Sequence, residues 1–464
     1  MQLNFVANAR VPSSSGRSLV VLDPSDGQPF DDIQRSNAHD VADAVAAARD
    51  AFDGVWSKFA AAERGRLLLR LAQEVEAHAG ELAAIVQRDG GKPPRQAAAQ
   101  VAVLAHCLAL VAATCERLLG EPVSHQNGYR VLTWREPYGV TAHLIPWYDP
   151  LRIFGRGVGA ALAAGNVCIV KPAEETSLAL LRVAELAAKA GFPAGAINIL
   201  TGYDQEVGEA LARHKGVDHV SLAGSPKLAT LVQQAAAEHN CPVALTLGGK
   251  SPRIVFADAS LDAAVPAIVH AVLHGACHTR AAGARLLVER AAYPAVLDRL
   301  EAAFEALRVG PAHVELGLDM GPLIRQSQQQ RVWDFLSDAH VAGIAMVAQG
   351  VVVDEAPETG FYQAPTLLCD VPLPQALALE DVPGPVLAAT PFDTEEQALA
   401  LANASSFNAV AHLWTSDEAR QLRLAKGLRC ARVAVNDSCV ENDAQEAFNE
   451  VLAFTSLKTV AIRQ

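Results

Sequence analysis

Short apolar segments of the strand type alternate with amphipathic helical segments along most of this chain, and this alternation constrains the fold more than any other feature. In one stretch, the apolar runs NVCIVKP, AINILTG, VDHVSLAG and PVALTLGG are separated by helical runs such as SLALLRVAELAAKAG. Strands that are separated by helices pair in parallel and form a doubly wound sheet. The same alternation resumes at PRIVFAD (252–258) and continues to ARVAVND (431–437). The pattern therefore predicts an α/β protein with two successive α/β units.

Two regions before these units have a different pattern. Residues 1–35 contain short strand-like runs such as SLVVLDP, and from Ala38 to about Leu119 apolar residues recur with the i, i+3, i+4 spacing of amphipathic helices. The run YRVLTWREPYGVTAHLIPW (129–147) predicts two extended segments around a Pro-Tyr-Gly turn. A helical region is thus expected to precede the parallel strands.

Net charge and cysteine usage exclude several classes of protein. The 464 residues carry a formal net charge of −13, which repels phosphate backbones, so no nucleic-acid partner is expected. No apolar run approaches the length of about 18 residues that spans a bilayer, and the N-terminal MQLNFVANARVPSSSGR lacks the apolar core of a signal peptide. The eight cysteines are scattered without a CxxC pair, which indicates free thiols. We therefore expect a cytoplasmic protein with no membrane partner.

Several motifs occur in an order that resembles the aldehyde dehydrogenase superfamily over nearly the whole chain. They are IPWYDP (145–150), KPAEETSL (171–178), GFPAGAINILTG (191–202), VDHVSLAGS (217–225), LTLGGKSPRIVFADASLDAAV (245–265), DMGPLI (319–324), EDVPGPV (380–386) and LKTVAI (457–462). The resemblance implies a dinucleotide-binding domain (1–126 and 142–246), a catalytic-type α/β domain (247–440) and a small oligomerisation sheet (127–141 and 455–464). It also implies a homodimer or a tetramer.

Members of this family use a cysteine nucleophile, an asparagine that binds the oxyanion and a glutamate that activates water. Counting without gaps from ADASLDAAV on one side and from AGARLLV on the other places the nucleophile position at Arg280, whereas Cys277 lies three residues too early. The glutamate position is occupied by Thr246, and the asparagine position by Tyr148, which Asp149 follows. None of these replacements has the chemistry of the family's residue, so the resemblance implies a degenerate active site.

The dinucleotide site is better retained than the catalytic positions. By resemblance, Lys171 and Glu174 bind the adenosine ribose, where a carboxylate accepts a ribose hydroxyl and repels a 2′-phosphate, which favours NAD over NADP. Gly224 and Ser225 precede a helix whose N-terminus meets the pyrophosphate, and Ser225 is the expected N-cap. The other cofactor-binding positions are Trp147, Gln328 and Asp381. Asp381 replaces the family's glutamate, and Arg280 would stand where the positively charged nicotinamide rests, so we expect NAD to bind weakly.

Two functions from different classes follow from this pattern. The first is a non-catalytic paralogue with an NAD-binding, structural or regulatory role, paired with itself or with an active homologue. The second is an NAD-dependent aldehyde oxidoreductase that uses Cys277 or an altered mechanism. For the first function, Arg280 is predicted to pair with Asp149 or Asp381 and to block the nicotinamide position.

A metal site is a further alternative. His274, Cys277 and His278 have the i, i+3, i+4 spacing of one helical face, which would suit a metal ion. A cluster at a helix end with no ligand is the simpler interpretation, because the sequence places no acidic or cysteine partner beside it. No metal is therefore predicted.

Overall fold

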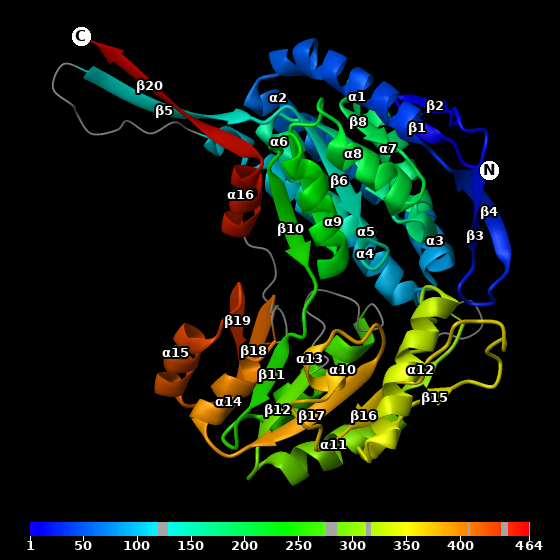
Figure 1. The fold of residues 1–464 in the computed structure, drawn as a ribbon, viewed down its shortest axis with the longest axis vertical. Helices are drawn as coiled ribbons and strands as arrows, with labels where there is room; N and C mark the ends of the chain where they lie inside the picture. The colour runs from blue at the N-terminus through cyan, green and yellow to red at the C-terminus, as the bar shows by residue number, and fades with distance from the viewer. Residues whose placement is uncertain (119–128, 275–284, 312–316, 406–408, 438–443, 464) are drawn as a thin grey trace.

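The computed structural model describes the chain except for residues 119–128, 275–284, 312–316, 406–408, 438–443 and 464. It consists of two α/β bodies, one above the other in Figure 1, each built on a mainly parallel sheet. The chain passes from the first body to the second between β10 (Val243–Leu247) and β11 (Pro252–Val255). The predicted α/β fold with two successive sheets is therefore confirmed.

The chain adds strands to the first sheet in one direction up to β8 and then in the opposite direction. Its described strands have the order β10-β9-β6-β7-β8-β1-β2 across the sheet. In chain order they are β1 (Asn4–Val6), β2 (Ala9–Val11), β6 (Val140–Ile145), β7 (Val167–Pro172), β8 (Ile197–Ile199), β9 (His219–Gly224) and β10. After β8 the chain crosses back and places β9 on the other side of β6. The carboxyl ends of β6 and β9 therefore flank a topological switch point, where open α/β sheets bind ligands.

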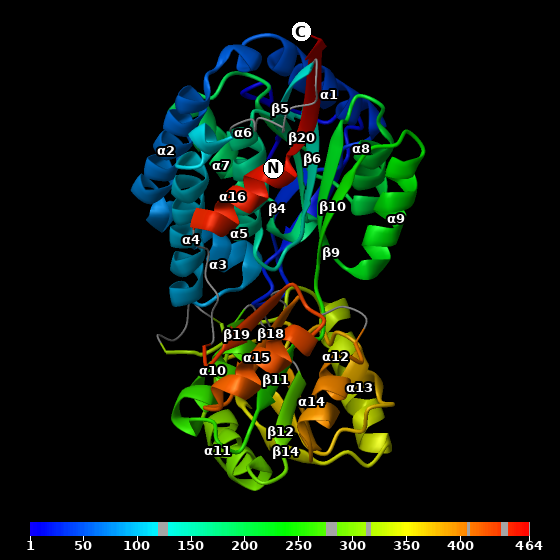
Figure 2. The same ribbon diagram turned by 90° about the vertical axis from the view of Figure 1, so that its left-hand side faces the viewer.

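Helices cover both faces of this sheet. They are α1 (Ala38–Asp53), α2 (Ala61–Ala77), α3 (Ala79–Gly90), α4 (Pro94–Ala112), α5 (Pro150–Ile153), α6 (Gly159–Ala164), α7 (Leu178–Ala190), α8 (Glu209–Arg213) and α9 (Pro226–Ala237), with short 3-10 or π turns between some of them. Figure 2 shows α2, α4 and α7 on one side of the sheet and α8 and α9 on the other. All residues of β6 and β7 are buried, as expected for central strands covered on both faces.

α4 is more apolar than the sequence analysis predicts. Within the segment Pro94–Arg117, an 18-residue window has a mean hydropathy of 1.9 and is long enough to cross a membrane, so the prediction that no such run exists is wrong. The helix packs against α2 and α3, and 56% of its apolar window is buried inside the protein. Burial in the core of the first body accounts for this composition, because such a helix contacts apolar neighbours on most sides.

The second sheet has the described strand order β14-β16-β17-β12-β11-β18-β19, and its pairs are parallel except for β14 with β16. The strands are β11, β12 (Arg285–Glu289), β14 (Met346–Gln349), β16 (Thr366–Leu368), β17 (Val386–Phe392), β18 (Val410–Trp414) and β19 (Arg432–Val435). The helices around it are α10 (Leu261–Leu273), α11 (Tyr293–Glu305), α12 (Gln326–Val341), α13 (Ala376–Leu379), α14 (Glu395–Ala402) and α15 (Glu418–Gly427). Two short sheets pair β3 (Ser18–Leu22) with β4 (Pro29–Gln34) and β13 (Arg308–Val309) with β15 (Val351–Val352).

A two-stranded antiparallel arm projects from the first body (Figure 1). β5 (Tyr129–Pro137) pairs with β20 (Thr455–Arg463) along the whole length of both strands. The two strands fall in the segments predicted for the oligomerisation sheet. β6 begins at Val140, so two residues of the predicted segment 127–141 lie in the first sheet instead.

Charged and aromatic contacts hold the root of this arm. α16 (Ala444–Ala453) leads into β20 and packs against α4 and α6. Arg156 forms ion pairs with Glu446 and Glu450 of this helix. At the junction of α16 and β20, the Phe454 ring lies 5.2 Å from the ring of His219, a buried residue of β9. The arm is thus anchored to the body that carries the first sheet.

Candidate functional site

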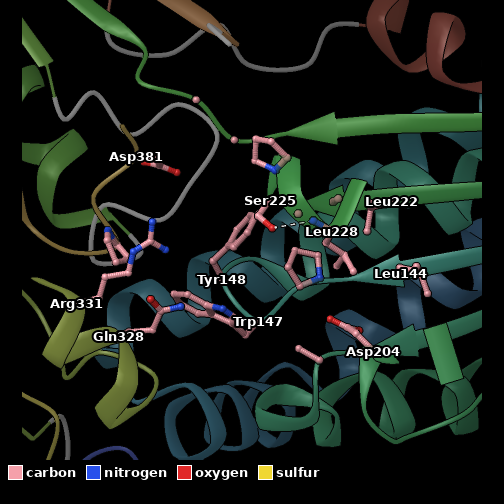
Figure 3. A pocket seen from close by; sticks show the side chains of 18 of the residues that line it. Leu144, Trp147, Tyr148, Asp204, Leu222, Ser225, Leu228, Gln328, Arg331 and Asp381 are labelled. Atoms are coloured by element: carbon pink, nitrogen blue, oxygen red, sulfur yellow. Dashed lines mark hydrogen bonds between the residues drawn. The ribbon is translucent and has the colours of Figure 1, made fainter. Parts of the chain in front are cut away.

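A cleft of about 580 Å³ lies between the two bodies, at the carboxyl ends of strands β6, β7 and β9 (Figure 3). This volume is within the range of roughly 300–1,000 Å³ that is typical of small-molecule sites. Seven residues singled out from the sequence line the cleft: Trp147, Tyr148, Glu174, Gly224, Ser225, Gln328 and Asp381. The two bodies both contribute to this set, so the fold brings together residues that are far apart in the chain.

One wall of the cleft is the start of α9. Gly224 ends β9, Ser225 is the N-cap of α9, and Pro226 is its first residue. The Ser225 hydroxyl accepts a hydrogen bond from the Leu228 N–H at 3.3 Å, which confirms the predicted N-cap. A helix N-terminus has N–H groups without partners in the helix and a partial positive charge from the helix dipole. This wall is therefore suited to a phosphate group.

A buried lysine lies among carboxylates at another part of the cleft. Lys171, near the end of β7, is fully buried, and its Nζ lies 2.5 Å from Asp204 Oδ1 and 3.6 Å from Glu174 Oε2. Glu174 and Asp204 both line the cleft. The sequence analysis singles out Lys171 and Glu174 but misses Asp204. A signal existed, because Asp204 follows the short strand β8, and residues after parallel strands gather at the ligand-binding edge of such a sheet.

An ion pair joins the two bodies beside the cleft. Arg325 directly precedes α12, and its Nη1 donates a hydrogen bond to Glu175 Oε1 at 2.6 Å. Burial raises the pKa of Glu175, the nearby charge of Glu174 raises it further, and Arg325 opposes this rise. The pair links the segment after β7 to the start of α12. Nothing in the sequence indicates a pair between residues 150 positions apart.

The segment after β6 places a buried carboxylate next to Tyr148. Lys92 Nζ donates a hydrogen bond to the Tyr148 carbonyl at 2.7 Å. Burial lowers the pKa of Lys92 to about 8, and the charges of Asp149 and Asp89 oppose this shift. Asp149 is 6% exposed, and its Oδ1 accepts no hydrogen bond from the described residues. A buried carboxyl group thus follows the position at which the resemblance implies an oxyanion donor.

Asp381 faces the open cleft from the second body. The protein atoms around it raise the pKa of its carboxyl by desolvation, and Lys250 and Arg331 oppose this shift. A Cβ atom at Gly248 would lie 3.4 Å from Asp381 Oδ2, so this glycine leaves room for the carboxylate to approach the first body. The position is therefore polar and accessible to a ligand in the cleft.

The positions implied for catalysis are not assembled among the described residues. Thr246 lies in β10, at the edge of the first sheet, where it pairs with Ala223, and it is not among the residues that line the cleft. Cys277 and Arg280 lie outside the described residues, and so does any pairing of Arg280 with Asp149 or Asp381.

The six cysteines that the structure describes are poor nucleophiles at neutral pH. Burial raises the pKa of Cys107, Cys115 and Cys241 to about 11 and that of Cys168 to about 12. Burial also raises the pKa of Cys369 and Cys430. Because the thiolate is the reactive form, a nucleophilic cysteine would have to be Cys277 or Cys439, which both lie outside the described residues.

The structure gives no support to the metal alternative. α10 ends at Leu273, and its C-cap His274 has an extended backbone with ψ 116°, so His274 does not continue the helical face. Its ring instead stacks on His270 with 5.5 Å between centroids. Cys277 and His278 lie outside the described residues, and within the part of the chain that the structure describes there is no group of three or more His, Cys, Asp or Glu residues suited to a metal ion.

The architecture and cleft define an α/β protein of the dinucleotide-binding class, with a second α/β body closing the ligand site. A model of the aldehyde dehydrogenase family matches residues 11–449. Hydroxyisobutyraldehyde dehydrogenase of Mycolicibacterium austroafricanum is 35% identical over 435 residues, which are 94% of this chain and 86% of that protein. The chain therefore belongs to the aldehyde dehydrogenase family, a family of oxidoreductases.

Solved structures agree with this assignment. The structure of a Burkholderia cenocepacia protein assigned to the aldehyde dehydrogenases has a TM-score of 0.97 and 53% identity, and the match covers 99% of each chain. PnpE in complex with nicotinamide adenine dinucleotide has a TM-score of 0.95 and 31% identity, with 100% of this chain and 98% of PnpE covered. The fold of the whole chain is thus that of the family.

Proposed function

We propose that this chain is a non-catalytic, NAD-binding member of its family, with a structural or regulatory role. The observation that carries the proposal is the replacement of three separate catalytic positions by Arg280, Thr246 and Tyr148. A guanidinium is not a nucleophile, and a threonine hydroxyl is not a general base near neutral pH. Removing a single catalytic group of these kinds typically costs about 10²-fold or more in rate, although such losses are not additive.

The surroundings of Tyr148 support this proposal. An oxyanion site requires hydrogen-bond donors that point at the developing negative charge. Here the residue that follows is Asp149, whose carboxylate is buried and has an oxygen without a hydrogen bond from the described residues. A carboxylate accepts hydrogen bonds and supplies no donor to a substrate oxygen, and the nearby Lys92 ammonium donates to the Tyr148 carbonyl instead.

The cleft retains what NAD requires. Its volume suits a small-molecule ligand, the start of α9 offers N–H groups to a pyrophosphate, and Glu174 offers a carboxylate to ribose hydroxyls. PnpE, whose structure contains the dinucleotide, supports the same choice of cofactor. Bound NAD would supply a hydride acceptor, but the residues implied for attack on an aldehyde are replaced. We propose NAD over NADP because the Glu174 carboxylate would repel a 2′-phosphate.

The arm formed by β5 and β20 supports assembly into a homodimer or tetramer, or with an active homologue. Its exposed apolar side chains include Tyr129, Trp134, Leu457 and Ile462, which are 38–59% exposed. Both edges of a two-stranded sheet also have backbone groups available for pairing with another chain. Such a surface is more stable when a second subunit covers it.

The test of the proposed function combines binding and turnover. Calorimetry of the purified protein should detect NAD⁺ binding, and the same protein should form no NADH with a broad panel of aldehydes. Aldehyde-dependent turnover within a hundredfold of a typical enzyme, for which kcat is about 10 s⁻¹, would overturn the proposal.

A second candidate is an NAD-dependent aldehyde oxidoreductase that uses Cys277. It is favoured by relatives that are named for an activity on an aldehyde, such as hydroxyisobutyraldehyde dehydrogenase. This candidate requires an accessible thiolate of low pKa, and the six described cysteines do not supply one. Rapid alkylation of Cys277 at pH 7, together with loss of turnover in Cys277→Ser, would establish it.

A further inference from the structure

The ammonium group of Lys171 has a nearer partner than Glu174. Lys171 is fully buried, and a buried charge is tolerated only when an opposite charge and hydrogen bonds compensate for lost water. Asp204 Oδ1 provides this compensation at 2.5 Å, whereas the Glu174 carboxylate lies at 3.6 Å. Asp204 is therefore the counter-ion that fixes the position of Lys171.

Asp204 is also accessible from the cleft. It begins the short π-helical turn Asp204–Gly208, its side chain is 36% exposed, and it lines the cleft (Figure 3). Glu174 lines the same cleft. The carboxylate thus has two neighbours: the buried ammonium behind it and the cleft in front of it. A ligand in this part of the cleft would meet both Asp204 and Glu174.

The charges of this region leave an excess of negative charge. Three carboxylates line it, those of Glu174, Glu175 and Asp204. Arg325 pairs with Glu175, and Lys171 pairs with both Asp204 and Glu174, so three carboxylates share two cations and one negative charge remains in excess. A phosphate on the ribose would have to displace Asp204 from Lys171 to gain a cationic partner, and it would face two carboxylates while doing so.

We infer that Asp204 is a second determinant of cofactor choice in this chain. It acts as a positioning residue that holds the Lys171 ammonium away from a 2′-phosphate, and its own carboxylate adds to the repulsion from Glu174. The site therefore selects adenosine with a free 2′-hydroxyl. This inference rests on the proposed binding of NAD and extends it from the ribose-facing Glu174 to the lysine behind it.

The test compares two probes that differ only in the 2′-phosphate: 5′-AMP and adenosine 2′,5′-bisphosphate. Calorimetry should be performed on wild type and on Asp204→Asn, in which the amide oxygen still accepts a hydrogen bond from Lys171 but carries no charge. We expect the bisphosphate to bind at least tenfold more tightly to D204N than to wild type. The affinity for 5′-AMP should change much less than that for the bisphosphate, because D204N keeps the hydrogen bond to Lys171 and 5′-AMP has no 2′-phosphate to repel.

Two further variants sharpen the comparison. Glu174→Gln should weaken 5′-AMP binding, since it alters the proposed ribose acceptor, whereas D204N should not. Asp393→Asn removes a carboxylate of the second body that pairs with Arg290 on the surface, and it should leave both affinities unchanged. A D204N protein with an unaltered ratio of the two affinities, or with both affinities reduced equally, would overturn the role of Asp204. Wild type that binds no 5′-AMP would overturn the proposed cofactor site as well.

Discussion

Replacing Arg325 with methionine should destabilise the protein to a degree that depends on pH. In this variant Glu175 remains buried beside Glu174 but loses the ion pair at 2.6 Å. When a carboxyl group has a higher pKa in the folded state than in the unfolded state, its protonation favours the folded state. Stability is therefore lost as the pH rises above the ordinary pKa of 4.5, until the pKa of the folded state is passed.

The size of the loss has an upper bound that follows from this reasoning. An unpaired Glu175 can always take up a proton, at a cost of about 1.36 kcal/mol for each unit by which the pH exceeds 4.5. The bound is thus about 4 kcal/mol at pH 7.5 and about 1.4 kcal/mol at pH 5.5. Breaking a buried pair typically costs about 3–5 kcal/mol, but here the Glu175 side chain is 16% exposed and the Arg325 side chain is 43% exposed, so solvent screens the pair and its loss costs less. We therefore expect R325M to lose about 1–3 kcal/mol at pH 7.5 and no more than about 1.4 kcal/mol at pH 5.5.

Urea unfolding of wild type and R325M at the two pH values measures these losses. The matched control is Arg299→Met, because Arg299 pairs with Asp262 on the surface with side chains 50% and 88% exposed. Such a pair contributes about 0–1 kcal/mol, and its loss should be similar at both pH values. An equal loss for R325M at pH 5.5 and pH 7.5, or a loss no larger than that of R299M, would refute the reasoning.

Three other outcomes follow from the structure. Removal of residues 457–464, which form most of β20, should convert the proposed oligomer to a monomer in light scattering, and a wild type that is already monomeric at micromolar concentration would contradict the proposed role of the arm. Burial lowers the pKa of His219 to about 4, so its neutral form stabilises the fold above pH 6.5 and up to about 3 kcal/mol should be lost as the pH falls from 6.5 towards 4. In urea unfolding, the free energy of unfolding of His219→Phe should fall less than that of wild type over this pH range. A variant with the same pH profile as wild type would contradict this role of His219. Alkylation of the native protein at pH 7, read by mass spectrometry, should leave the six described cysteines unmodified, and rapid labelling of any of them would contradict their raised pKa values.

The sequence predicted the parts of the site that depend on local chemistry. Ser225 before Pro226 is a helix-start signal, and Ser225 is indeed the N-cap of α9. Lys171 and Glu174 follow an apolar run, and they lie at the carboxyl end of β7 as expected for a ligand-binding edge. These features are set by residues a few positions apart, so their pattern is visible in the sequence.

The missed features depend on how distant strands are ordered. Asp204 reaches Lys171 because β8 lies beside β7 in the sheet, which the sequence of either segment does not state. Glu175 reaches Arg325 only because the second body closes against the first. The apolar length of α4, by contrast, is a property of the sequence itself and could have been predicted from it, whereas its burial among other helices is a tertiary property.

The most direct test of the central claim is a single experiment that measures cofactor binding and turnover on the same preparation. The protein should bind NAD⁺ in calorimetry and, at saturating NAD⁺, should produce no NADH above the blank with any aldehyde of a broad panel. Because a typical enzyme turns over at about 10 s⁻¹, a rate above about 0.1 s⁻¹ that depends on aldehyde would contradict the non-catalytic assignment. Binding of NAD⁺ without such turnover is the result that the account predicts.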